Sequence, residues 1–274
     1  MKTIGVFGAN GMLGKYVVSY LRLKNYEVYP FSRENCDLSN YDEYFKINEL
    51  IQTCTHIVNC AGTIKPVSEK QSSALTFMVN TIFPNYLARE CENKDIAMYH
   101  ITTDCIYSGD KGHYNESDKC DAYDDYGLSK WMGENQNICN IRTSIIGEET
   151  KNKRSLLEWA KSQKGNEING YTNHYWNGVT CLQFAKILDY LIQYNIYWSG
   201  DARHIFSESV SKFELLNIIS HYFNLSLKIS PVEASIYCDR TLDTAYYGLE
   251  DYPVISIKEQ IKELAEFHDT LFRN

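Results

Sequence analysis

Short apolar runs alternate with longer segments of helical periodicity along the first half of the chain. The longer segments place apolar side chains three or four positions apart, as in Leu13, Val17 and Leu21. This alternation predicts βαβ units with right-handed crossovers, and hence an α/β fold with a doubly wound parallel sheet. The expected strands are 2–8, 26–32, 55–61, 97–103 and 138–146, and the expected helices are 11–25, 41–53, 73–93 and 123–137.

The second half of the chain has a less regular pattern. No linker of low complexity divides it from the first half, so a small lobe packed on a main domain is expected. We predict a Rossmann-like dinucleotide-binding domain at 1–148 and a smaller, mainly substrate-binding lobe at 149–274, with a segment of about 178–206 returning to the first domain. The expected helices are 155–163, 180–194, 209–222 and 256–272.

Composition excludes several kinds of partner. The 274 residues carry a net charge of −8 with a pI near 5.4 and show no basic stripe, which argues against nucleic-acid binding. The first residues lack the apolar h-region of a signal peptide, and the sequence has no run of about 18 apolar residues, so we expect no membrane contact and a cytoplasmic location. The nine cysteines include no CxxC pair, which disfavours a disulfide framework and a metal site.

The turn after the first strand carries glycines at the spacing GxxGxxG, as Gly8, Gly11 and Gly14 in GANGMLG. Glycines allow the backbone to approach a pyrophosphate, whose charge is stabilised by the N-terminus of the following helix. A plain glycine turn is the alternative. The position of the motif in the first βαβ unit favours a dinucleotide cofactor.

The end of the second strand bears on the choice of dinucleotide. An acid there would bind the ribose 2′-hydroxyl of NAD, but the strand ends Phe31-Ser32-Arg33. Arg33 could pair with a 2′-phosphate and Ser32 could donate a hydrogen bond to it, so NADPH is expected, with NADH as the alternative. A solvated arginine without a cofactor role is the other interpretation of Arg33.

A tyrosine and a lysine stand four residues apart in YGLSK, on the helix expected at 123–137. Tyr126 and Lys130 would share one helix face, and an ammonium near the phenol would lower the pKa of the tyrosine. The tyrosine could then exchange a proton with a carbonyl or alcohol oxygen near neutral pH. YxxxK alone is common, but here it follows a glycine loop and a strand that ends in hydroxyl side chains.

Together these features resemble the extended short-chain dehydrogenases/reductases, and in more detail the dTDP-4-dehydrorhamnose reductases. The blocks TTDCIYSGDKGHYNESD, DDYGLSKWMGE and IRTSIIG are similar to those of that family, and NCAG, NTIFPNYLARE and RTLDT fit it as well. The resemblance implies hydride transfer from NAD(P)H to C4 of a 4-keto-6-deoxyhexose linked to dTDP, UDP or GDP. Such a reaction belongs to the biosynthesis of deoxysugars for surface polysaccharides. We expect a monomer or a homodimer.

The resemblance also assigns roles to individual residues. The catalytic hydroxyl would be Thr103, the proton donor Tyr126, and the lysine that also holds the nicotinamide ribose Lys130. The substrate would be contacted by Asp104, Cys105, His174 and Trp176. The cofactor would be contacted by Gly8, Asn10, Gly11, Met12, Leu13, Gly14, Ser32, Arg33, Asp37, Leu38, Cys60, Ala61, Gly62, Tyr126, Lys130, Thr143 and Ser144.

Cys105 departs from the family, whose members usually have a tyrosine at this position. It could simply reshape the pocket. It could also move protons beside the 4-keto group, as the similar cysteine of GDP-fucose synthases and plant-type UDP-rhamnose synthases does. The protein would then be a bifunctional 3,5-epimerase/4-reductase, with His174 as the proton partner. A redox-sensing thiol is the third interpretation.

Two further alternatives stay open. The β subunit of methionine adenosyltransferase resembles these reductases and binds NADP as a regulatory subunit, so a non-catalytic role is possible, although the intact Thr103, Tyr126 and Lys130 favour an enzyme. In the second half, His174 could be a hydrogen-bonding loop histidine. Tyr175 and Trp176 could stack on a base or sugar, or could belong to the core. A 4,6-dehydratase is disfavoured because its second acid, a glutamate, is absent from the TTDC block.

Overall fold

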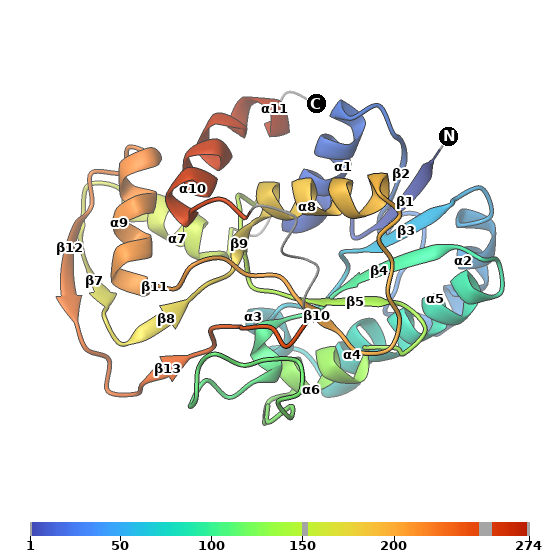
Figure 1. Ribbon diagram of the computed structural model, residues 1–274, viewed down its shortest axis with the longest axis horizontal. Helices are drawn as coiled ribbons and strands as arrows, with labels where there is room; N and C mark the ends of the chain where they lie inside the picture. The colour runs from blue at the N-terminus through green and yellow to red at the C-terminus, as the bar shows by residue number, and fades with distance from the viewer. Residues whose placement is uncertain (1, 150–152, 247–253, 273–274) are drawn as a thin grey trace.

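A six-stranded parallel sheet forms the centre of the molecule in the computed structural model, which describes residues 2–149, 153–246 and 254–272 (Figure 1). The strands lie in the order β10-β5-β4-β3-β1-β2, and each neighbouring pair is parallel. The order in which the strands are added therefore reverses beside β1, and open parallel sheets bind ligands at such a reversal. The strands are β1 (Thr3–Phe7), β2 (Glu27–Phe31), β3 (His56–Asn59), β4 (Ala97–Ile101), β5 (Cys139–Arg142) and β10 (Arg203–His204).

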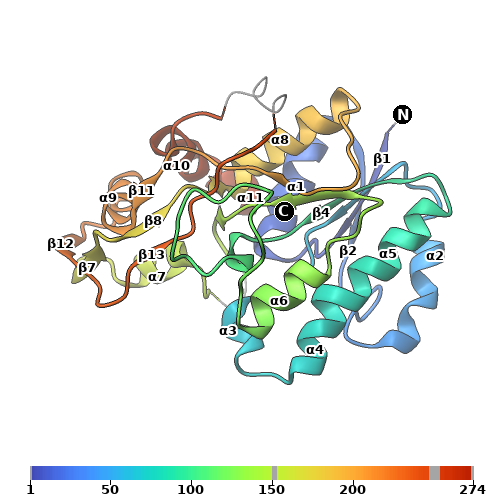
Figure 2. The same ribbon diagram turned by 60° about the horizontal axis from the view of Figure 1, so that its bottom comes forward.

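Helices cover both faces of this sheet, which makes the fold doubly wound and Rossmann-like. α1 and α8 pack together on one face, and α2, α4, α5 and α6 lie on the other (Figures 1 and 2). The predicted α/β class and parallel sheet are confirmed. The helices are α1 (Met12–Leu23), α2 (Phe45–Leu50), α4 (Ser73–Phe77), α5 (Phe83–Glu92), α6 (Asp125–Met132) and α8 (Cys181–Gln193).

Apolar side chains are buried on both faces of the sheet. Ile4 and Val6 pack with Leu188 of α8 on one face, and Phe7 and Ile57 belong to the core under α5 on the other. Successive strand residues point to opposite faces, so a strand covered on both sides has a continuous apolar run instead of an alternating one. Full burial of one such side chain contributes roughly 1.5–3 kcal/mol to folding.

The second half of the chain forms a smaller lobe beside the main sheet (Figure 1). Its strands pair as β12-β7, β11-β8-β13 and β6-β9, and α9 packs on β7 and β12. The segment 178–206 contributes α8 to one face of the main sheet and β10 to its edge. The elements are β6 (Ile145–Ile146), α7 (Leu156–Ser162), β7 (Glu167–Tyr171), β8 (His174–Trp176), β9 (Val179–Thr180), β11 (Val210–Ser211), α9 (Lys212–Tyr222), β12 (Lys228–Val232), β13 (Cys238–Asp239), α10 (Ile257–Glu266) and α11 (His268–Phe272).

Several expected helices are shorter or divided. The segment 73–93 consists of α4, a π-helical turn at Met78–Ile82 and α5. Pro84 explains the interruption, because it has no N–H to donate to the carbonyl of Asn80, four residues earlier. The helix expected at 123–137 ends at Met132. A short helix that was not expected, α3, spans Lys65–Ser68.

The other divided elements have similar bounds to those expected. The segment 41–53 contains a 3₁₀ turn at Tyr41–Glu43 followed by α2, and 138–146 contains β5 and β6. The segment 256–272 contains α10 and α11. Within the described ranges, every helix is too short or too polar to cross a bilayer.

Candidate active site

A cavity of about 480 Å³ lies at the carboxyl ends of β1, β2 and β3. Gly8 begins the first of the turns that line it, with a φ of +74°, a left-handed backbone that glycine adopts without strain. A Cβ at Gly8 would lie 2.7 Å from the backbone of Ala61, so the two turns are in close contact. The cavity is lined by these predicted cofactor residues: Gly8, Asn10, Gly11, Ser32, Arg33, Asp37, Leu38, Cys60, Ala61 and Gly62.

The start of α1 is adapted to a pyrophosphate. Gly14 lies against the first turn, since a Cβ there would lie 2.2 Å from the carbonyl oxygen of Gly8. Gly11 is the N-cap of α1 and provides no side-chain cap, so the N–H groups of the first turn stay available to an anion. The donor set and the glycine contacts therefore fit a dinucleotide. Met12 and Leu13, two other predicted contacts, pack in or against the core.

Arg33 is exposed at the end of β2, and its Nε lies 3.7 Å from Oδ1 of Asp37. The hydroxyl of Ser39 donates a hydrogen bond to Asp37 at 2.7 Å, and this bond lowers the pKa of the Asp37 carboxyl, as does the charge of Arg33. Ser32 accepts the N–H of Glu34 at 3.3 Å. The cavity therefore contains a cation and a carboxylate at the position where a 2′-phosphate would be recognised.

Thr103, Tyr126 and Lys130 come together at the carboxyl end of β4. Thr103 is the N-cap of a 3₁₀ turn, Asp104–Ile106, and its side chain is hydrogen-bonded to that of Tyr126. The ammonium of Lys130 donates to the carbonyl of Ile101 at 3.2 Å, and a Cβ at Gly62 would lie 2.7 Å from it. Since Gly62 lines the cavity and Ile101 is the last residue of β4, the ammonium of Lys130 lies between the cavity and the end of β4.

Burial controls the ionisation of these groups. It raises the pKa of the Tyr126 phenol, Cys105 raises it further, and the hydrogen bond with Thr103 lowers it. Burial also lowers the pKa of the Lys130 ammonium to about 8, against smaller opposing effects of Cys60 and other neighbours. The expected lowering of the tyrosine pKa by Lys130 is therefore wrong for this structure, because desolvation dominates. The phenol stays protonated at neutral pH, as a proton donor must.

Cys105 lies beside Thr103 with a largely buried thiol. Burial raises the pKa of this thiol to about 12, the charge of Asp104 raises it too, and Arg240 lowers it. Asp104 is 7% exposed, its pKa is raised by burial and lowered by Arg240, and its Oδ1 accepts the hydroxyl of Thr103 at 3.1 Å. The thiol is therefore uncharged at neutral pH.

His174 is hydrogen-bonded within the C-terminal lobe. Its Nε2 lies 2.8 Å from the carbonyl oxygen of Ile236, so this ring nitrogen already has a partner. Trp176 is 6% exposed, and its Nε1 donates to the hydroxyl of Ser144 at 2.9 Å. The indole is therefore a core side chain with a satisfied donor.

The remaining predicted residues lie near the strand ends. Thr143 and Ser144 follow β5, and the carbonyl of Ser144 accepts the N–H of Val179 at 2.9 Å. Thr143 is 2% exposed. Tyr175 is exposed, and its ring centroid lies 6.2 Å from that of Tyr237. Neither Thr143 nor Ser144 lines the cavity between β1 and β3.

Sequence reasoning missed Asn80, which joins the cavity to α6. Its side chain accepts the N–H of Thr63 at 2.8 Å and donates to the carbonyl of Thr63 at 3.1 Å and to the hydroxyl of Ser129 at 3.0 Å. Thr63 and Val79 line the cavity, and Ser129 precedes Lys130. Asn80 lies in the π-helical turn, where helical periodicity gives no signal.

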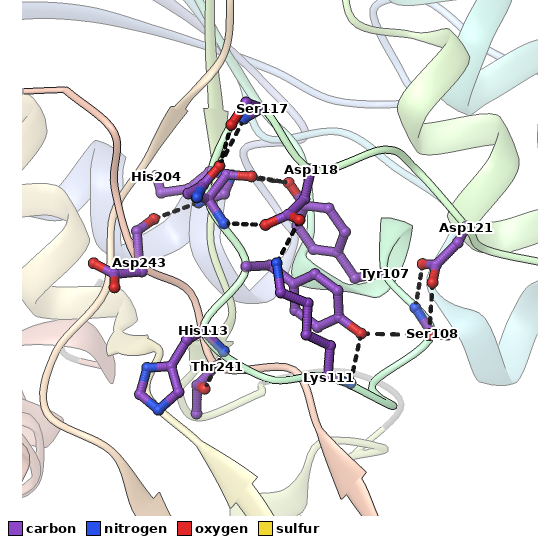
Figure 3. Close-up of polar contacts among 12 residues, drawn as sticks. Tyr107, Ser108, Lys111, His113, Ser117, Asp118, Asp121, His204, Thr241 and Asp243 are labelled. Carbon is purple, nitrogen blue, oxygen red and sulfur yellow. Dashed lines mark hydrogen bonds and ion pairs between the residues drawn. The ribbon is translucent and has the colours of Figure 1, made fainter.

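A buried polar network around Tyr107 links the main sheet to the C-terminal segment (Figure 3). The hydroxyl of Tyr107 lies 3.0 Å from Nη1 of Arg142 and 3.2 Å from Nε2 of His204. Nδ1 of His204 lies 2.8 Å from the carbonyl oxygen of Asp243. The carbonyl of Tyr107 accepts Nε–H of Arg240 at 2.8 Å, so the same network fixes the arginine that faces Cys105.

A family model described as the RmlD substrate binding domain matches residues 1–164. A probable low-salt glycan biosynthesis reductase of Haloferax volcanii is 31% identical over 139 residues, which are 47% of this chain and 46% of that protein. A dTDP-4-dehydrorhamnose reductase of Aggregatibacter actinomycetemcomitans is 28% identical over 244 residues, 80% of this chain and 83% of that protein. The match thus spans about half the length of the first of these relatives.

Solved structures have the same fold. The dTDP-4-dehydrorhamnose reductase of Bacillus anthracis in complex with NADP superposes with a TM-score of 0.80 at 20% identity, over 96% of this chain and 99% of that chain. The likeness therefore includes the main sheet and the C-terminal lobe.

Proposed function

The chain belongs to the family of the RmlD substrate binding domain, and from this premise we propose that it is an NADPH-dependent reductase of a nucleotide-linked 4-keto-6-deoxyhexose. The observation that carries the proposal is the meeting of Thr103, Tyr126 and Lys130 beside the cavity of β1 to β3. The relatives described as dTDP-4-dehydrorhamnose reductases support the reaction class, and the NADP complex of one of them supports the cofactor. Deoxysugar biosynthesis in the cytoplasm is the corresponding role.

The cofactor would be held by the glycine turn, by Arg33 and Asp37, and by the turn at Cys60–Gly62. NADPH supplies the hydride that is added to C4 of the sugar. The N-terminus of α1 would stabilise the pyrophosphate charge, and Lys130 would donate to the ribose hydroxyls from its place beside Gly62.

Tyr126 would donate its phenolic proton to the C4 oxygen as hydride arrives, which converts the ketone into an alcohol. Burial keeps the phenol protonated until that step, and the hydrogen bond with Thr103 holds the phenol beside the residue that follows β4. The phenolate that remains takes up a proton from solvent, which restores the phenol. The hydride and the proton together account for the two hydrogens that the product gains.

Replacement of Tyr126 by Phe tests the proposal. The variant should bind NADPH nearly as the wild type does and should lose turnover by about a hundredfold or more, because only the proton donor is removed. The measurement is NADPH oxidation with dTDP-, UDP- and GDP-linked 4-ketosugars, together with a fluorescence titration of NADPH. Tyr123→Phe is the matched control, since Tyr123 is exposed and lies just before α6.

The outcomes separate an enzyme from a non-catalytic NADP-binding subunit. Wild-type protein that binds NADPH but reduces none of the ketosugars would favour the regulatory alternative. Undiminished turnover in Tyr126→Phe would exclude Tyr126 as the proton donor. Identification of the product by mass spectrometry then determines the nucleotide and the sugar.

A further inference from the structure

The turn that carries Thr103 is held at both of its ends by buried side chains. Thr103 is the N-cap of the 3₁₀ turn that follows β4, and Tyr107 is its C-cap. Thr102 stands just before the turn, and its hydroxyl donates a hydrogen bond to Oε1 of Glu134 at 2.9 Å. At the other end, the hydroxyl of Tyr107 accepts Nη1–H of Arg142 at 3.0 Å. The chain on either side of Thr103 is therefore bonded to Glu134 and Arg142.

Glu134 and Arg142 are joined to each other by a bidentate ion pair. Nε of Arg142 donates to Oε1 of Glu134 at 2.8 Å, and Nη2 donates to Oε2 at 2.7 Å. The side chain of Arg142 is 9% exposed and that of Glu134 is 10% exposed. Two parallel bonds fix the relative orientation of the two groups as well as their distance. The pair therefore forms a rigid bridge from Thr102 to Tyr107 that spans the turn.

Stability alone does not explain this buried pair. Two buried charges lose hydration that their mutual attraction replaces only in part, and an apolar pair of similar size is often at least as stable. An apolar pair could not, however, bond to the hydroxyls of Thr102 and Tyr107. Arg142 donates from all three of its nitrogens, and both carboxylate oxygens of Glu134 accept. The pair is therefore suited to holding these hydroxyl groups in place.

Glu134 also connects the turn to the helix of Tyr126 and Lys130. It directly follows Gly133, the C-cap of α6, and its backbone N–H donates to the carbonyl of Trp131 at 3.1 Å. Burial lowers the pKa of Lys130, and the negative charge of Glu134 opposes this shift. The carboxylate is therefore near enough to the ammonium to favour its protonated form.

We propose that Glu134 is a positioning residue for the reduction, because its carboxylate holds both ends of the turn that carries Thr103 and ties this turn to the helix of Tyr126 and Lys130. The inference rests on the proposed function, since the groups that Glu134 positions are those of the proposed reaction. Glu134 does not line the cavity of β1 to β3, so it acts through these groups and not on the cofactor. A misplacement of about 1 Å in such a site can cost a hundredfold in rate.

Replacement of Thr102 tests the hold on the turn without removing either charge. Thr102→Val keeps the shape of the side chain and loses the hydroxyl, so kcat should fall at least about tenfold, while KM and the dissociation constant of NADPH stay within about twofold. Thr102→Ser keeps the hydroxyl and should retain most of the wild-type kcat. The measurement is NADPH oxidation with the ketosugar that the wild type reduces. Thr76→Val is the control, since Thr76 is a buried threonine of α4 whose hydroxyl accepts Nε2–H of Gln71 at 2.9 Å.

Removal of both charges separates positioning from stability. In the double variant Glu134→Leu/Arg142→Met, the thermal unfolding midpoint should stay close to that of the wild type, because an apolar pair replaces the ion pair. Its kcat should fall at least about tenfold, since both ends of the turn are released. NADPH titrations need no turnover. Binding should be similar to the wild type at pH 6.5 and at least about threefold weaker at pH 8.5, because Lys130 without the nearby carboxylate loses its proton at a lower pH.

The outcomes decide each part of the proposal. An unchanged kcat in Thr102→Val, or a loss matched by Thr76→Val, would overturn the hold on the turn. The same pH dependence of NADPH binding in the double variant and the wild type would overturn the link to Lys130. A double variant that no longer folds would make the pair a structural element, which also overturns the proposal. If the wild type reduces no ketosugar, the proposed reaction fails, and the pH dependence of NADPH binding then decides the role of Glu134 by itself.

Discussion

At the scale of single residues, Lys130 combines a functional position with an energetic cost. Lys130 is 8% exposed and has no carboxylate at ion-pair distance among the described residues, while the carbonyl of Ile101 accepts a hydrogen bond from its ammonium. Burial lowers the pKa of this lysine from 10.5 to about 8. The unfolded chain keeps the ordinary value, so folding at neutral pH requires the burial of a charge. The buried charge of Lys130 therefore destabilises the ligand-free protein, at the place where a cofactor would bind.

Replacement of Lys130 by Met should therefore stabilise the ligand-free protein at pH 7, by up to about 3 kcal/mol for a shift of this size. Below pH 8 the lysine is charged in both the folded and the unfolded state, and the full cost is present. As the pH rises from 8 to 10.5 the folded state holds fewer protons than the unfolded state, so the cost disappears. Urea unfolding of both proteins between pH 6.5 and 9.5 should show a gain that declines with pH, and Lys228→Met should show no such gain. An NADPH titration should show weakened binding at every pH.

Cys105 leads to a prediction about chemistry at the carbons beside the ketone. A thiol with a pKa of about 12 supplies almost no thiolate at neutral pH, and His174 is bonded elsewhere, so the wild type should not exchange protons at C3 or C5. Incubation with a 4-ketosugar in D₂O without NADPH, followed by mass spectrometry, measures this exchange. Cys105→Ser should alter substrate affinity more than turnover, and Cys120→Ser should alter neither. Deuterium incorporation that vanishes in Cys105→Ser would instead establish a bifunctional epimerase-reductase.

Sequence reasoning located some site residues and missed others for physical reasons. Thr103, Tyr126 and Lys130 could be found because a strand end and a helical spacing of four place their side chains on known sides. The direction in which the pKa of Tyr126 shifts could not be predicted, because it depends on burial by the whole fold. Arg240 reaches the turn after β4 only through the packing of the lobe, where it donates to the carbonyls of Tyr107 and Ser108, and no spacing in the sequence relates it to Cys105.

At the scale of elements, the strands of the main sheet could be predicted and those of the lobe could not. β1, β3 and β4 are buried on both faces, so each has a continuous apolar run that stands out in the sequence. β8 and β13 have three and two residues and mix buried with exposed positions, which is too short for a period to be detected. The lobe was nevertheless expected as a unit, because no linker of low complexity divides it from the first half of the chain.

The turn after β2 gives the element-scale prediction. Arg33 is exposed beside Asp37, in a position to form charge-assisted hydrogen bonds with a 2′-phosphate. Arg33→Ala should weaken NADPH binding roughly tenfold, since such bonds contribute about 1.5–3 kcal/mol before solvent screening reduces them, and should leave NADH binding nearly unchanged. Titrations with both cofactors measure the ratio of dissociation constants. Arg89→Ala, at an exposed position on α5, is the control. A wild type that binds NADH as tightly as NADPH would refute the preference.

At the scale of the whole molecule, three histidines sit in strands of the main sheet with lowered pKa values. Burial lowers the pKa of His56 to about 4 and lowers that of His100 well below the ordinary value. Asn59 donates to Nδ1 of His100, because its own oxygen accepts the N–H of Ala61, so His100 carries its proton on Nε2. Burial also lowers the pKa of His204, against the opposing charge of Glu116. The three side chains are neutral in the folded protein.

The folded protein should therefore lose stability as the pH falls from 7.5 to 5. Above pH 6.5 these histidines are neutral in both states and contribute nothing to the pH dependence. Below it the unfolded chain gains protons that the folded chain cannot take, which costs about 2 kcal/mol at pH 5 for each fully buried histidine. Asp104 acts in the opposite direction, since its raised pKa favours folding in acid, but it is one group against three.

Urea midpoints between pH 5 and 7.5 should fall steeply for the wild type and less steeply for His204→Gln, whereas His221→Gln, at an exposed position, should follow the wild type. Midpoints that do not change over this range would mean that the sheet accepts these protons, and the neutral His204 at the junction between the main sheet and the C-terminal segment (Figure 3) would then be the wrong description.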